Sequence, residues 1–480
     1  MGIHTCRVNV DLLFAAASLL FLCFLVRQGR GHAAAAAAAA THPHTHYILQ
    51  SSYFLPPTSN VCTPSSKGPG NGTSLILVHK HGPCSQLARP NLAAHSTATE
   101  ILAQDQSRVD SIQSRLSKTF RQPDKSTSIP ANSGVSLGSG NYIVTVGLGT
   151  PKKKLSLIFD TGSGLTWTQC QPCKSCYKQK DPIFVPARST SYSNVSCRSD
   201  LCSQVANSTA NSPACSGSTC SYAIQYGDQS FSIGLAGQDK LSLTASDVFD
   251  GFLFGCGQRN EGLFAAAAGL LGLSRDQTSF VSQTAAKYGK FFSYCLPSTP
   301  SSAGFLKFGN TRVSPATKFT SLLTKDSSFY YLKLDAISVA GKTLPIPASV
   351  FISAGIIDSG TVISRIPEAA YDALKAAFRR QMSKYPLTGA LSILDTCYDL
   401  SKYKTVTVPK ISLFFGGGVE VGVAPSGILY AANASQACLA FAGNSDVGGI
   451  TIFGNTQQLT LEVVYDVGQG RLGFRSGGCS

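Results

Sequence analysis

The sequence predicts a mostly β protein whose two halves carry similar chemistry, and three observations lead to this. Short runs of Val, Ile, Thr, Phe and Tyr, broken by Gly, Pro and Ser, recur along the 480 residues, a pattern typical of strands and turns. Apolar residues make up 43% of the chain and charged residues only 14%, so a large core is expected. A short loop motif also occurs once in each half, in a chain longer than one typical domain.

The first copy of this motif is Asp160-Thr161-Gly162-Ser163, which follows the apolar run 155–159. An Asp at the end of a buried strand is costly unless donors surround it, and this loop offers hydroxyl and backbone N–H donors. The second copy, Asp358-Ser359-Gly360-Thr361, again follows two bulky aliphatic residues. A single copy is most simply a turn between two strands. Two copies predict that the two carboxylates meet in one site.

The segments around the two motifs also correspond. In the first half a strand at 141–149 precedes the motif, and the hydrophobic-Gly segment 268–273 follows it. In the second half the strand 330–334 precedes the motif, and the hydrophobic-Gly segment 451–455 follows it. We expect the two hydrophobic-Gly segments to be strands that support the loops. Two helices, 279–288 and 367–385, are expected as scaffold.

The N-terminal region predicts a secretory signal peptide. An apolar run at 12–26 follows a short segment carrying Arg7, and it is too short for a typical transmembrane helix. We assign residues 1–31 to the signal peptide, whose end could extend into the Ala run that follows. A plastid transit peptide is the alternative, and the uninterrupted apolar run argues against it.

Residues 32–130 are interpreted as a propeptide. Within them one helical stripe is apolar apart from one acidic residue, with Arg108 and Arg115 beside it. The stripe consists of Leu102, Asp105, Val109, Ile112 and Leu116. We expect this basic helix to cover an acidic cleft, and the segment 122–138 to be open to cleavage. The alternative is a disordered linker.

Cysteine usage indicates an oxidising compartment. Of the 16 cysteines, Cys6 and Cys23 would leave with the signal peptide and Cys62 and Cys84 with the propeptide, so an even number remains. Four potential N-glycosylation sites agree with a secretory route: Asn71, Asn194, Asn207 and Asn433.

The residue types also exclude several kinds of site. The tight spacing of Cys170, Cys173 and Cys176 could suggest metal ligation, but the last His of the chain is His95, so no His lies in the predicted mature region. The same absence removes Ser-His-Asp and Cys-His catalysis, because the base is missing. Neither a metal nor another cofactor is therefore expected.

The formal charge of +15 does not indicate nucleic-acid binding. Basic residues are scattered, and the densest run is only Lys152-Lys153-Lys154. Scattered cations favour a basic surface over a binding stripe. We expect no nucleic-acid partner and no stable membrane anchor.

Taken together, these motifs resemble the pepsin-like (family A1) aspartic proteases, and within them the plant nepenthesin-like group, over residues 135–480. The resemblance rests on the two Asp loops, on Trp167 seven residues after Asp160, and on the flap-like segment 223–228 around Tyr226 and Gly227. The cysteine-rich stretch 170–220 is similar to the insertion that marks the group. Gly164 after the first loop and Gln229 in the flap depart from the usual pattern.

The resemblance implies an all-β, bilobal pepsin-like fold with a few short helices. It places the N-terminal lobe at 131–315 and the C-terminal lobe at 316–480. It also implies six disulfides that account for the remaining cysteines: Cys170–Cys173, Cys176–Cys256, Cys197–Cys220, Cys202–Cys215, Cys295–Cys479 and Cys397–Cys438.

The activity that the resemblance implies is an acid endopeptidase, made as a secreted zymogen and acting as a monomer on proteins or peptides. Asp160 and Asp358 would share one proton and activate a water molecule. Thr161 and Ser359 would join the two loops, and Ser163 and Thr361 would bond the outer carboxylate oxygens. Tyr226 would close over the substrate and bond the indole of Trp167.

Two other interpretations remain open. The first is a catalytically weak inhibitor or binding protein on the same fold, like the plant xylanase inhibitors, although both Asp loops are intact here. The second is a plastid nucleoid-associated relative. For the leading interpretation, an extracellular (apoplastic) or vacuolar destination is expected.

Overall fold

Strands form most of the regular structure, in agreement with the predicted fold class. The computed structural model describes residues 45–50, 53, 62, 73–80, 82–87, 97–118, 142–209, 211, 214–226, 230–262, 264, 266–309, 313–325, 328–444 and 449–479. The predicted signal peptide and the segment 122–138 lie outside these residues. From His46 onward the chain belongs to one compact unit.

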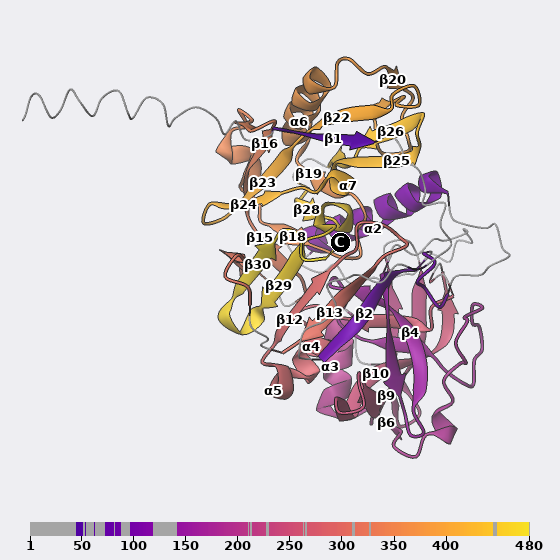
Figure 1. Ribbon diagram of the computed structural model, residues 1–480. Coiled ribbons are helices and arrows are strands. Elements are labelled where there is room, and N and C mark those ends of the chain that lie inside the picture. The colour runs from indigo at the N-terminus through magenta and orange to yellow at the C-terminus, as the bar shows by residue number, and fades with distance from the viewer. Residues whose placement is uncertain are drawn as a thin grey trace, which may run out of the picture. The chain divides into compact units, whose positions relative to one another are not determined.

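The largest sheet joins strands from both halves of the chain (Figure 1). Its main path runs through β14 (Lys318–Ser321), β30 (Arg471–Arg475), β29 (Glu462–Asp466), β12 (Phe291–Cys295), β13 (Ala303–Phe308), β2 (Thr73–His79), β3 (Tyr142–Leu148), β4 (Lys153–Asp160), β11 (Gly269–Gly272), β5 (Trp167–Gln169), β10 (Val248–Glu261), β9 (Phe231–Ser242), β8 (Thr219–Gln225) and β7 (Ala214–Ser216). A further strand, β6 (Ser193–Asn194), pairs with β9. Strand β2 comes from the predicted propeptide and lies between β13 and β3.

The second half builds three smaller sheets. The first contains the Asp358 strand and consists of β15 (Tyr330–Leu332), β18 (Gly355–Ile357), β28 (Ile452–Phe453), β19 (Ser364–Ile366) and β27 (Phe441–Gly443). The second is β17 (Lys342–Thr343), β16 (Leu334–Val339), β23 (Ile411–Phe415) and β24 (Val419–Gly422). The third is β20 (Leu387–Thr388), β21 (Cys397–Tyr398), β26 (Gln436–Leu439) and β25 (Leu429–Asn433). Outside them, β1 (His46–Gln50) pairs with β22 (Thr405–Pro409), and the sequence patterns did not indicate β1.

Helices are few and mostly short. They are α2 (Ala98–Lys118), α3 (Asp200–Ser208), α4 (Phe280–Gln283), α5 (Ala285–Tyr288), α6 (Glu368–Gln381) and α7 (Pro425–Ile428), with 3₁₀ turns at η2 (Pro186–Arg188), η3 (Ala348–Phe351), η4 (Asn455–Gln458) and η5 (Val467–Gln469). None of the helices in the described part of the chain is long and apolar enough to cross a bilayer.

The two predicted scaffold helices are present with different bounds. Helix α6 occupies the middle of the predicted segment 367–385 and begins directly after Pro367. The predicted helix 279–288 is instead two short helices, α4 and α5, separated at Thr284. Gly289 ends the second one in the left-handed conformation, with φ 64°, which favours glycine.

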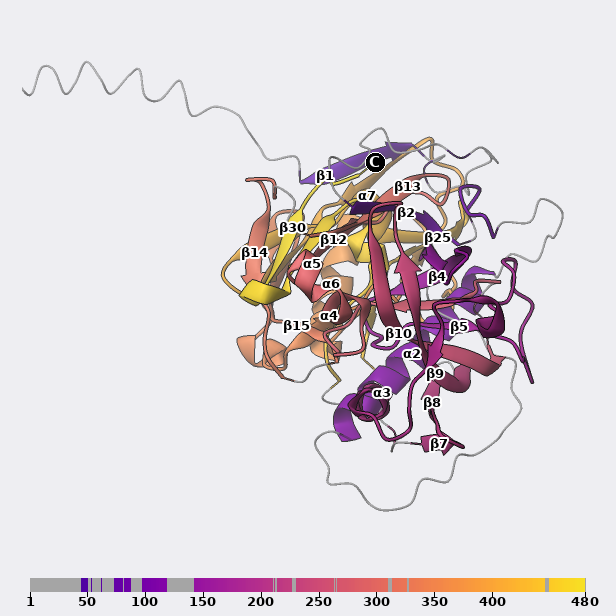
Figure 2. The same cartoon turned by 90° about the horizontal axis from the view of Figure 1, so that it is seen from below.

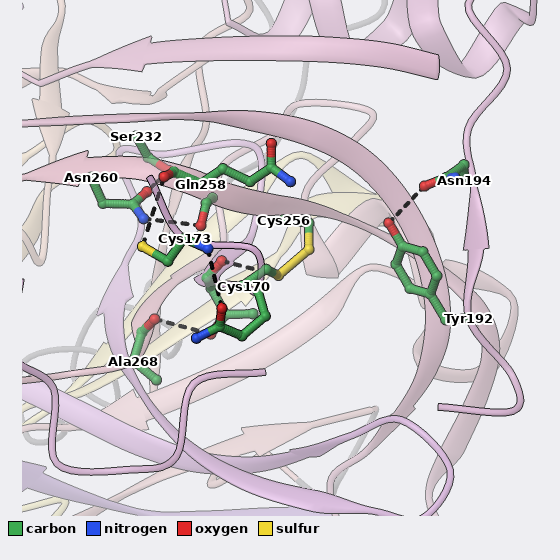
Figure 3. The surroundings of a disulfide bond; sticks show 12 residues. Cys170, Cys173, Tyr192, Asn194, Ser232, Cys256, Gln258, Asn260 and Ala268 are labelled. Carbon is green, nitrogen blue, oxygen red and sulfur yellow. Dashed lines mark hydrogen bonds between the residues drawn. A yellow bond between two sulfur atoms is a disulfide. The ribbon is translucent and has the colours of Figure 1, made fainter. Parts of the chain in front are cut away.

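The disulfide pairing corrects four of the six expected bonds. The structure joins Cys295 to Cys479 and Cys397 to Cys438, as expected. It does not form the other four expected bonds, Cys170–Cys173, Cys176–Cys256, Cys197–Cys220 and Cys202–Cys215. It forms instead Cys170–Cys256, Cys173–Cys176, Cys197–Cys215 and Cys202–Cys220, and adds Cys62–Cys84 (Figure 3 shows Cys170 and Cys256).

Burial explains the corrected pairing. In each cluster of four, two cysteines lie in the core and two lie nearer the surface. Cys170 reaches Cys256 because β5 pairs in parallel with β10, and Cys202 reaches Cys220 where α3 packs on β8. The spacing of cysteines in the sequence does not indicate which of them are buried. It therefore could not distinguish the expected pairing from the observed one.

Three of the four predicted glycosylation sites are exposed in the structure. They are Asn194 on β6, Asn207 on α3 and Asn433 at the end of β25. Asn71 lies outside the described residues. The exposed sites are sterically open to a glycan, and their occupancy stays a prediction.

Candidate active site

The two Asp loops are held by matching pairs of parallel strands. Strand β4 ends at Asp160 and pairs with β11, so that Leu271 lies opposite Phe159. Strand β18 leads into Asp358 and pairs with β28, so that Phe453 lies opposite Ile357. The hydrophobic-Gly segments are therefore the supporting strands that the sequence predicted.

The two loops are joined to each other by reciprocal hydrogen bonds. The backbone N–H of Ser359 donates to Thr161 Oγ1 at 2.9 Å, and the backbone N–H of Thr161 donates to Ser359 Oγ at 3.1 Å. The two hydroxyl oxygens are 3.3 Å apart. Because all these groups are buried, the contact fixes the two carboxylates relative to each other.

Each carboxylate also receives donors from its own loop. Ser163 Oγ donates to Asp160 Oδ2 at 2.5 Å, and Thr361 Oγ1 donates to Asp358 Oδ2 at 2.6 Å. The backbone N–H groups of Gly162 and Gly360 donate to the Oδ1 atoms of the respective Asp at 2.9 and 3.1 Å. The donor-rich turn that the sequence predicted is thus present in both loops.

Arg108 of α2 lies between the two carboxylates. Its Nη2 donates to Asp160 Oδ1 at 2.8 Å and to Asp358 Oδ1 at 3.0 Å. Its Nε donates to Asp358 Oδ2 at 2.9 Å, and its Nη1 to Asp160 Oδ2 at 3.3 Å. Because Nη2 bonds both Oδ1 atoms, the two carboxylates lie side by side although they are far apart in the sequence.

The glycines of both loops make room for this guanidinium. A Cβ atom at Gly360 would lie 2.2 Å from Arg108 Nη2, and one at Gly162 would lie 2.8 Å from the same atom. Neither distance is sterically possible for carbon. A methyl group at Gly360 would therefore push the guanidinium away, and the two glycines allow the close approach of Arg108.

The charges at the pair explain its electrostatics. Burial alone would raise the pKa of Asp160, but the Arg108 guanidinium and the hydrogen bonds from Ser163 and Gly162 hold this pKa below its ordinary value. Burial would lower the pKa of Arg108, and the two carboxylates raise it above its ordinary value instead. The cation is therefore firmly charged, and its field stabilises the ionised form of Asp160.

The apolar face of helix α2 packs on the second half of the chain. Figures 1 and 2 show the helix from two sides. It begins with a capping box, in which Thr97 and Glu100 bond each other's backbone N–H groups. The predicted apolar stripe is buried, and Val109 and Ile112 pack in one cluster with residues of β15, β18 and β28. The helix therefore lies over the two Asp residues, as expected for a basic helix that covers an acidic cleft.

Two polar side chains of α2 bond the backbone of the second half. Asp105 accepts from the N–H groups of Val362 and Ile363 at 2.5 and 3.0 Å, and it forms an ion pair of 3.1 Å with Arg365. Gln113 both donates to and accepts from the backbone of Ile450. These bonds occupy backbone groups that border the cleft.

Tyr226 and Trp167 form the predicted hydrogen bond. The indole Nε1–H donates to the phenol oxygen of Tyr226 at 2.7 Å, and Trp167 is fully buried. Gly227, the predicted flap tip, lies outside the described residues. Next to Tyr226 and Arg108 a cavity of about 60 Å³ remains. It has room for a few water molecules but not for an extended peptide.

Comparisons with known proteins agree with this geometry. Residues 142–310 match the family model described as xylanase inhibitor N-terminal, and residues 329–476 match the one described as xylanase inhibitor C-terminal. An aspartyl protease family protein of Arabidopsis thaliana is 55% identical over 442 residues, covering 90% of this chain and 93% of that protein. The chain belongs to the nepenthesin-like plant aspartic proteases.

Within this family, the aspartic proteinase nepenthesin-2 of Nepenthes gracilis is 36% identical over 344 residues, covering 69% of this chain and 76% of that protein. A solved structure, the basic 7S globulin from soybean, superimposes with a TM-score of 0.58 at 22% identity, covering 71% of this chain and 92% of that one. The fold is therefore pepsin-like, as predicted.

Some residues of the site were not identified from the sequence. Asn455 donates to the carbonyl oxygen of Ser359, and Gln458 donates to that of Phe453. Asn455 ends the second hydrophobic-Gly segment and Gln458 follows it by three residues, and this position is the signal from which both could have been identified. Arg108 was expected only as part of a basic helix, because nothing in its spacing reports a contact with both Asp residues. Among the described residues, no three His, Cys, Asp or Glu side chains are arranged to hold a metal ion.

Proposed function

We propose that this chain is an aspartic endopeptidase made as a secreted zymogen and active at acid pH. The observation that carries the proposal is the pair formed by Asp160 and Asp358, whose loops bond each other directly. When Arg108 leaves, two adjacent buried carboxylates cannot both stay ionised, so one takes up a proton and the pair titrates as a unit.

Such a pair can hydrolyse a peptide bond without a covalent intermediate. The ionised carboxylate removes a proton from a bound water molecule while the neutral one donates a hydrogen bond to the peptide carbonyl oxygen. The hydrogen bonds from Ser163 and Thr361 orient the outer oxygens. Tyr226 lies beside the remaining cavity, where it can cover a substrate.

In the proposed zymogen, Arg108 bonds both carboxylates, and its positive charge favours the ionised form of Asp160. Helix α2 also fills the space that a substrate would need. Cleavage near residue 130 and departure of α2 would expose the pair. The sequons and disulfides support a secretory route to the cell exterior or the vacuole.

The test is acidification of the purified full-length chain. We expect loss of the segment up to about residue 130, cleavage of denatured globin, inhibition by pepstatin, and no cleavage by Asp160→Asn. Full cleavage of globin by Asp160→Asn would contradict the mechanism.

A second candidate is a xylanase inhibitor, which the descriptions of the two matching family models favour. It predicts inhibition of a xylanase by the chain and no proteolysis of globin after acidification. The intact Asp loops support the protease instead.

A further inference from the structure

Beside the catalytic pair, three donors of the second half converge on the carboxylate of Asp105. The N–H groups of Val362 and Ile363 bond one oxygen each, and the Arg365 guanidinium bonds Oδ2. Both Asp105 and Arg365 are fully buried. We refer to these donors, Val362 N–H, Ile363 N–H and the Arg365 guanidinium, as the anion cradle.

The anion cradle belongs to the body of the protein, whereas its occupant belongs to the predicted propeptide. Arg365 lies on β19 and is held by its own bond from Nη1 to the carbonyl oxygen of Ile363 at 2.7 Å. Within the part of the chain that the structure describes, its Nη2 bonds groups of α2, namely Asp105 and Gln106. Its Nε has no hydrogen-bond partner within the described residues. If α2 leaves, a positively charged, donor-lined position is left facing the cleft.

The anion cradle lies close to the reacting bond. Asp105 precedes Arg108 by three residues, which is just under one helical turn, a rise of about 5 Å. An extended peptide advances about 3.3 Å per residue. A side chain in the cradle would therefore belong to a residue within about two positions of the scissile bond.

We propose that in the activated protein the anion cradle binds the carboxylate of an Asp or Glu side chain of the substrate, in the position that Asp105 occupies here. This inference rests on the proposed function. A carboxylate gives the guanidinium a charged partner and accepts from both N–H groups, as Asp105 does. A neutral amide leaves the buried charge without its counter-ion, which is costly.

The test uses acid-activated protein and short quenched fluorescent peptides with one cleavable bond. A single Glu is moved through the three positions on each side of that bond, and every peptide has a twin with Gln instead. The kcat/KM ratio of Glu to Gln peptide is measured at about pH 6, because the ordinary carboxyl pKa is about 4 and burial raises the pKa of Asp105 in this position. The proteins are the wild type, Arg365→Gln, Arg365→Lys and, as a matched control, Arg380→Gln, which removes an exposed Arg of α6.

We expect a ratio of about tenfold or more at one position in the wild type and in Arg380→Gln, the size typical of a charge-assisted hydrogen bond. The ratio should fall close to one in Arg365→Gln and lie between in Arg365→Lys, which keeps the charge but loses the fork of donors. If Arg365→Gln does not fold, as judged by its melting curve, a lowered ratio in Arg365→Lys carries the test.

Two results would overturn the proposal: a ratio near one at every position in the wild type, or an undiminished ratio in the Arg365 variants. Denatured globin separates this failure from that of the proposed function. If globin is cleaved but no peptide position shows a preference for Glu, only the proposed role of the anion cradle is refuted. If globin is not cleaved at all, the proposed protease function is refuted.

Discussion

Replacing Arg108 by Gln should weaken the closure of the cleft by α2. The Arg108 side chain is only 10% exposed and makes four hydrogen bonds to the carboxylates of Asp160 and Asp358. Removing one partner from a buried ionic group costs about 3–5 kcal/mol, because the remaining charges lose their compensation. The docked state of α2 should lose this amount relative to the open state, which corresponds to roughly 10²- to 5 × 10³-fold more opening.

The assay is hydrolysis of a small peptide by the uncleaved full-length chain at about pH 6, above the range below about pH 4 where acid is expected to release α2. We expect measurable activity before any processing in Arg108→Gln and none in the wild type. Hydrogen exchange of the α2 amides should accelerate in parallel. Arg380→Gln loses the same charge from an exposed position and should stay latent. If Arg108→Gln is as latent as the wild type and exchanges at the same rate, Arg108 does not hold the cleft closed.

Three further predictions follow from the same contacts. The pKa of Asp160 is lowered in the folded chain, so the ion pair between Asp160 and Arg108 contributes fully to closure above the ordinary pKa of about 4 and is lost as the pH falls through the lower folded pKa. Activation of the wild type should therefore accelerate below about pH 4. An activation rate independent of pH would contradict this. Gly360→Ala should displace Arg108 and raise the activity of the uncleaved chain at early times, unless the same methyl group blocks the substrate; an unchanged crystal structure around Arg108 would contradict the steric argument. Trp167→Phe should lower kcat/KM by about tenfold through loss of the bond to Tyr226, with Tyr226→Phe as the matched variant, and wild-type rates in both would show that the bond is not used.

Local chemistry explains which parts of the site were predictable from the sequence. A carboxylate at the end of an apolar strand needs donors within a few residues, so the roles of Ser163 and Thr361 follow from the motif itself. Helical periodicity likewise predicted the buried face of α2. The position of Arg108 depends on how that face seats on sheets built from distant segments, and periodicity does not report this. Asp105 interrupts the apolar stripe, and its partners, the backbone of 362–363 and Arg365, were not predicted.

The disulfides and β1 mark the limit of sequence reasoning in this chain. Within each cysteine cluster, spacing allows several pairings, and the outcome depends on which sulfur atoms the sheets bury. Strand β1 has only five residues, and it is a strand because β22 offers it an edge. Both features are decided by tertiary contacts that leave no local signal.

If the proposed cleavage near residue 130 takes place, the position of β2 has a consequence for refolding. This strand lies inside the largest sheet, with six residue pairs to β13 on one side and further pairs to β3 on the other. A cut near residue 130 severs the covalent link but leaves this ladder intact, so release of the strand is a separate, slower event that must break backbone hydrogen bonds. Once it has gone, β13 and β3 have lost the neighbour against which they were assembled. Under the proposed processing, the N-terminal segment would serve once as a folding template, and the processed chain would persist through a high unfolding barrier and not through its ability to fold again.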